Sequence, residues 1–177
     1  MTNKPDLRDV DEAAMKKFCA AIGELILWAS LIDEQLNKAL VGMFALPEHA
    51  MIEPIVAQLD ARPKAELLKK RAKTIPSKDW KNGITNWVER AEKANANRNT
   101  VAHHAIRIEG GTITLHTSQL GKILSNLKDS EGKLEAGDRK GLSDIQAWID
   151  QARNTYIEGQ NIIANLDRFR EAAAKAV

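Results

Sequence analysis

Hydrophobic residues recur at alternating steps of three and four along the first quarter of the chain. The series begins after Asp9 or Asp11, either of which can cap a helix N-terminus, and runs to about Met43. Because this spacing keeps the apolar residues on one helical face over four heptads, it predicts a long helix packed lengthwise against partners. The residues on this face are Met15, Phe18, Ile22, Leu25, Ala29, Ile32, Leu36, Ala39 and Met43.

Three further helices are predicted before residue 98. An apolar group at 51–59 indicates a short helix. Pro63 then stands in the first turn of the next helix, and Pro76 ends it. Ser77 can cap the third, which continues toward Arg98. Its apolar face consists of Trp80, Ile84, Trp87, Ala91 and Ala94.

The period of the pattern changes after residue 100. Two segments rich in β-branched residues, 101–108 and 112–117, flank Gly110 and Gly111, which supply the positive φ of a tight hairpin turn. A brief helix is predicted at 120–127, a polar connection at 128–141, and a long last helix from 142 to about 173. The predicted fold class is therefore all-α, a bundle of long amphipathic helices with a short β-hairpin insertion at about 103–117, in a single domain spanning 1–177.

Composition narrows the functional classes. The 177 residues suit one domain, and a net charge of +2 is too balanced for an avid, non-specific nucleic-acid binder. The first ten residues lack the apolar core of a signal peptide, and no later stretch is long and apolar enough to span a membrane. We therefore expect a cytoplasmic protein with no membrane partner. The one cysteine, Cys19, is expected to be a small buried apolar side chain.

Several enzyme classes are disfavoured by their missing motifs. The chain has no glycine-rich phosphate loop, no Gly-x-Ser-x-Gly elbow and no paired-cysteine metal motif. A zinc site at His103, His104 and His116 is an alternative, since hairpin strands would bring the last two together, but a clear fourth ligand is missing. The sequence thus predicts neither a cofactor nor a metal.

The segment 97–104, at the junction of helix and hairpin, does not fit a plain bundle. Arg98 continues the apolar stripe of the preceding helix, so its guanidinium is expected to point into the bundle. An unpaired buried charge costs several kcal/mol, so Arg98 requires a partner. Asp33, one heptad from both Ile26 and Leu40, offers one. We predict an Asp33–Arg98 ion pair, which either orients a site or only fixes helix register.

The same segment resembles the signature of HEPN (higher eukaryotes and prokaryotes nucleotide-binding) domains. In that signature an Arg and a following polar residue precede a His by a few positions. Here Arg98 and Asn99 are followed by His103, and His104 also fits the spacing. Members of the family are helical bundles of this size, and their long first helix often carries an acidic residue.

The acidic residue would be Asp33 or Glu34. The resemblance implies metal-independent RNA cleavage by a toxin or defence effector. Arg98 would hold the phosphate, His103 or His104 would act as the base, Asn99 would assist, and Asp33 would orient the arginine.

The implied partners are RNA, a second copy of the chain in a homodimer, and an antitoxin or other protein. The alternative interpretation is a non-catalytic HEPN-like module that binds nucleotide or a partner and dimerises.

A basic run from 62 to 81 contains eight basic residues and two acidic ones. Lys69, Lys70, Arg71 and Lys73 lie within it and could guide an RNA backbone. The same run is explained equally well if these residues form the solvent-exposed face of a helix and have no role in binding.

Overall fold

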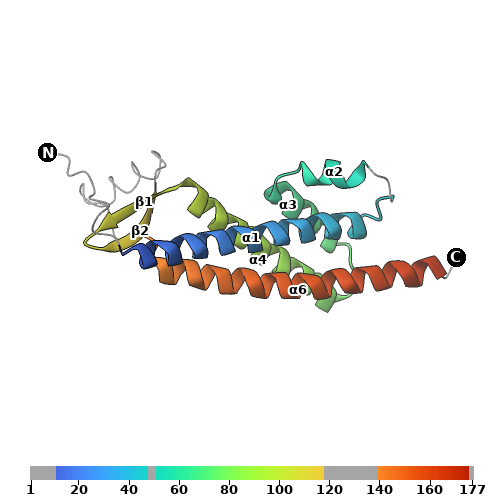
Figure 1. The fold of residues 1–177 in the computed structure, drawn as a ribbon. Coiled ribbons are helices and arrows are strands. Elements are labelled where there is room, and N and C mark those ends of the chain that lie inside the picture. The colour runs from blue at the N-terminus through green and yellow to red at the C-terminus, as the bar shows by residue number, and fades with distance from the viewer. Residues whose placement is uncertain (1–10, 48–50, 118–138, 176–177) are drawn as a thin grey trace, which may run out of the picture. The chain divides into compact units, whose positions relative to one another are not determined.

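A computed structural model of the protein describes residues 11–47, 51–117 and 139–175, with side chains described except at 117 and 167–175. The predicted helix at 120–127 and most of the predicted connection at 128–141 lie outside the described residues. The all-α class with a hairpin insertion is confirmed. In chain order the elements are α1 (Glu12–Met43), α2 (Ile52–Ala57), α3 (Ala61–Ala72), α4 (Lys78–His103), β1 (His104–Glu109), β2 (Thr112–Thr117) and α6 (Leu142–Lys175) (Figure 1).

The chain divides into two compact units. The hairpin unit comprises 1–26 and 97–149, and the helical unit comprises 27–96 and 150–177. Helices α1, α4 and α6 contribute residues to both units. None of the helices in the described part of the chain is long and apolar enough to cross a membrane.

Helix α1 follows the predicted heptad pattern. Its N-terminus is capped by Asp11, whose Oδ1 accepts a hydrogen bond from the backbone N–H of Ala13 at 3.0 Å. The predicted stripe is buried at seven of its nine positions, with Met15 and Ile22 only half-buried. The expectation for Cys19 is wrong, because this side chain is exposed. Cys19 directly follows buried Phe18, and a step of about 100° around a helix turns it away from the stripe.

The hairpin unit carries the two-stranded sheet. Strands β1 and β2 pair antiparallel, with Ile108 opposite Ile113 (Figure 1). Gly110 and Gly111 form the turn with φ of 56° and 77°, the backbone that a tight turn between twisted strands needs. The predicted first strand began at 101, but 101–103 are the last residues of α4. Buried Val101 belongs to the apolar face of that helix, which explains the difference.

The helical unit is held by apolar stripes and by polar side chains that bind the backbone of α6. Ile84, Trp87, Ala91 and Ala94 of the predicted α4 face are buried, and Trp80 is half-buried. The indole Nε1 of Trp87 donates to the carbonyl of Thr155 at 3.1 Å. Gln35 Nε2 donates to the carbonyl of Tyr156 at 2.9 Å. Both bonds satisfy buried polar groups at the same stretch of α6.

Candidate nucleic-acid site

Three of the predicted catalytic residues occupy the C-terminal turns of α4, in the hairpin unit. Arg98, Asn99 and His103 are all exposed. The guanidinium Nη1 of Arg98 donates a hydrogen bond to Asn99 Oδ1 at 3.0 Å. The Asn99 side chain therefore holds the arginine on the surface of this helix end.

Helical geometry sets how these side chains face one another. Asn99 and His103 are four residues apart, so they lie on the same face of α4, one turn from each other. Arg98 and His103 are five residues apart, which separates their directions by about 140° on a regular helix. Asn99 is thus the neighbour of both, and the long arginine side chain reaches toward it.

The prediction that the Arg98 guanidinium points into the bundle is wrong. Position 98 does continue the α4 stripe, because Ala94 and Val101 on either side of it are buried. The Arg98 side chain is nevertheless exposed. A long arginine side chain can lie along an apolar surface with its stem and carry its charge into water, which avoids the cost of burial. Arg98 therefore does not need a buried carboxylate.

Asp33 has a different partner from the predicted one. In the helical unit the Nζ of Lys64 binds both carboxylate oxygens of Asp33, at 2.9 Å and 2.8 Å. The Lys64 side chain is 1% exposed and that of Asp33 is 37% exposed. The sequence contained a signal for this cation, because Lys64 is one residue before Ala65 and four before Leu68 on the buried face of α3.

Glu34, the other acidic residue of α1 considered for the site, is exposed and lies in the helical unit. Its carboxylate is 2.7 Å from the Nζ of Lys38. The hydrogen bond to Glu34 raises the pKa of Lys38 above its ordinary value. Glu34 therefore forms a local ion pair with Lys38, one turn further along α1.

Two other histidines considered for the site, His104 and His116, lie on the hairpin. His104, the alternative base, is the first residue of β1 and is half-buried. His116 is buried, with its Nε2 3.0 Å from Thr114 Oγ1. His116 pairs with Ala105, so His104 lies on the opposite face of the ribbon. The predicted approach of these two histidines is wrong, and the described residues contain no group of three metal-ligating side chains.

The predicted RNA-binding residues lie at the C-terminal end of α3, in the helical unit. Lys69 forms an ion pair with Glu92 at 2.8 Å. The Arg71 guanidinium donates to the Met43 carbonyl and to Thr74 Oγ1. Lys70 and Lys73 are exposed, as a phosphate contact requires.

Comparison of the chain with protein-family models, with curated proteins and with solved structures finds no match.

Proposed function

We propose that the protein is a HEPN-like, metal-independent endoribonuclease that acts as a toxin or defence effector. The observation that carries the proposal is the hydrogen bond between Arg98 and Asn99 on an exposed helix end, one turn from His103. This arrangement gives a nucleic-acid backbone access to a fixed cation and to a group that can accept a proton.

The reaction follows from the two side-chain types. The imidazole of His103 takes the proton from a ribose 2′-hydroxyl, and the resulting oxyanion attacks the adjacent phosphorus. The bond from phosphorus to the 5′-oxygen breaks, and this oxygen takes a proton from the solvent or from a second acid. Arg98 binds the phosphate oxygens as negative charge develops on them. Asn99 acts by holding the guanidinium in place.

A homodimer would complete this small set of groups. Each chain carries one pair of these groups, Arg98 and His103. Their side chains leave α4 in directions that differ by about 140°. A two-fold axis near 98–104 would place the arginine of one copy beside the histidine of the other. Light scattering at micromolar concentration should therefore find a dimer.

The decisive experiment is incubation with mixed RNA in the presence of EDTA. Wild type should cut the RNA, and His103→Ala should cut it slower by about two to four orders of magnitude, the usual contribution of a positioned general base. Arg98→Ala should be similarly impaired. Arg153→Ala removes an exposed arginine of α6, outside the basic run, and is the matched control, which should cut at the wild-type rate.

A protein that binds RNA without cutting it would contradict the nuclease and favour the alternative, a non-catalytic HEPN-like binding module. In cells, expression should slow growth, and Arg98→Ala should abolish this effect.

A further inference from the structure

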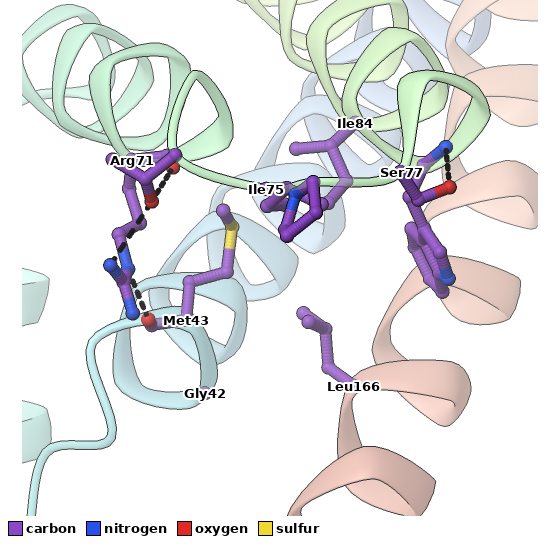
Figure 2. A pocket seen from close by; sticks show the side chains of 10 residues that line it. Gly42, Met43, Arg71, Ile75, Ser77, Ile84 and Leu166 are labelled. Carbon is purple, nitrogen blue, oxygen red and sulfur yellow. Dashed lines mark hydrogen bonds between the residues drawn. The ribbon is translucent and has the colours of Figure 1, made fainter.

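A pocket opens in the helical unit where the ends of α1 and α3 meet the start of α4 and part of α6 (Figure 2). Its volume is about 590 Å³, within the range of small-molecule sites. The residues that line it are Gly42, Met43, Arg71, Thr74, Ile75, Pro76, Ser77, Trp80, Ile84 and Leu166. None of the proposed catalytic residues Arg98, Asn99 and His103 is among them, whereas Arg71 is one of the predicted RNA-binding residues.

The walls of the pocket are mainly apolar. Figure 2 shows the side chains of Met43, Ile75, Ile84 and Leu166 gathered around it from four parts of the chain. Ile75 and Leu166 are only half-buried, so a bound apolar chain would remove them from water. The hydroxyl of Ser77 already accepts a hydrogen bond from the Trp80 N–H at the start of α4. The apolar lining therefore calls for a ligand with an extended hydrocarbon part.

One edge of the pocket is positively charged. Arg71 is fixed there, since its Nε donates to the Met43 carbonyl at 2.9 Å and its Nη1 to Thr74 Oγ1 at 3.1 Å (Figure 2). A guanidinium carries five N–H donors, so these two bonds leave others for an anion. Lys70 and Lys73, within two residues of Arg71 in sequence, are exposed. A carboxylate is the complementary group at this edge.

We propose that this pocket binds an amphipathic carboxylate of the fatty-acid type. The hydrocarbon chain lies against Met43, Ile75 and Leu166, and the carboxylate binds the guanidinium of Arg71. The pocket contains none of the proposed catalytic residues, so this proposal stands or falls independently of RNA cleavage.

Calorimetric titration of the full-length protein with decanoate tests the proposal, with decanol and acetate as comparison ligands. Decanoate should bind, decanol should bind more weakly, and acetate should not bind. Arg71→Gln should weaken decanoate about tenfold, the worth of a charge-assisted hydrogen bond, and should leave decanol unchanged. Arg71→Lys should retain part of the affinity because it keeps the charge.

A second set of variants tests the location. Ile75→Trp should fill the pocket and abolish decanoate binding, while Leu67→Trp, the same kind of change at an exposed position of α3, should not. Circular dichroism would show that both variants fold. If Ile75→Trp does not fold, the emission of Trp80, which lines the pocket, tests the location instead. Decanoate should change the tryptophan emission of the wild type, and Trp80→Phe should bind decanoate without this change.

Three results would overturn the proposal. The first is no decanoate binding at millimolar concentration, as expected if another part of the chain or a second copy fills the pocket. The second is that the wild type binds decanoate and decanol with equal affinity and that Arg71→Gln changes neither affinity. The third is unchanged binding to a folded Ile75→Trp or an unchanged emission response in Trp80→Phe.

Discussion

Gly159 of α6 leaves room for the side-chain oxygen of Gln35 from α1. A Cβ atom at position 159 would lie 2.2 Å from Gln35 Oε1 and 2.7 Å from the indole Nε1 of Trp87. Both neighbours are buried. Gln35 Oε1 accepts no hydrogen bond from the described residues. The two bonds that Gln35 and Trp87 donate to α6 therefore depend on a glycine at 159.

Gly159→Ala should destabilise the protein. The added methyl group must displace two hydrogen-bonded side chains in a close-packed interior, at a cost of about 1–3 kcal/mol in the free energy of unfolding. Gly83→Ala is the matched control. Its Cβ would meet nothing within 4 Å, so removing a glycine from the interior of α4 should stabilise by about 0.5–1 kcal/mol. Urea denaturation measures both, and equal stability of the two variants would contradict the steric argument.

Removing one charge of the ion pair between Asp33 and Lys64 should lower the free energy of unfolding by different amounts, depending on which residue is changed. Asp33→Asn leaves the ammonium of Lys64, which is 1% exposed, without a counter-charge, and should cost about 3 kcal/mol or more. Lys64→Met leaves a carboxylate that is 37% exposed and can be hydrated, so it should cost less. Thermal and urea denaturation of both variants would measure the difference. A larger loss for Lys64→Met would refute this account.

The helices and the hairpin could be predicted because local sequence determines them. The heptad steps from Phe18 to Met43 specify α1, and the pair Gly110-Gly111 specifies the turn. The sequence places the end of α4 too early because β-branched Val101 suits both a strand and the apolar face of a helix.

The side-chain partners could not be predicted from periodicity. Arg98 and Lys64 both occupy apolar stripes, yet only Lys64 is buried. The difference is that Lys64 forms an ion pair with Asp33, which is distant in sequence, whereas Arg98 lies near the end of α4, where its side chain reaches water. The fit of Gln35 against Gly159 joins residues more than a hundred positions apart, and no local pattern encodes it.

The basic residues of α3 should differ in their contribution to RNA affinity. Exposed Lys70 and Lys73 are available to phosphates, while Lys69 is paired with Glu92. The double variant Lys70→Gln, Lys73→Gln should make the slope of log affinity against log salt shallower by about 1.4, or roughly 0.7 for each lost phosphate contact on a single strand. Lys16→Gln, at an exposed pair with Glu12, serves as the control. An unchanged slope in the double variant would exclude phosphate contacts by Lys70 and Lys73.

The chemistry of the product ends tests which group acts in the proposed cleavage. Because the nucleophile would be the RNA's own hydroxyl, the products should carry 2′,3′-cyclic phosphate and 5′-hydroxyl ends, and cleavage should persist in EDTA. A substrate with a 2′-O-methyl group at the cut position should stay intact. Mass spectrometry of the reaction mixture would identify the product ends and would show whether the 2′-O-methyl substrate stays intact.

The two adjacent histidines can be separated by the same assay. His103 is exposed on the face of α4 that carries Asn99, and His104 is half-buried at the start of β1. His103→Ala should therefore lower the cleavage rate by about two to four orders of magnitude, and His104→Ala should lower it far less. A larger loss of rate in His104→Ala than in His103→Ala would identify His104, on β1, as the base. Full activity in the double variant, or loss of activity in EDTA, would show that neither histidine is the base of a metal-independent reaction.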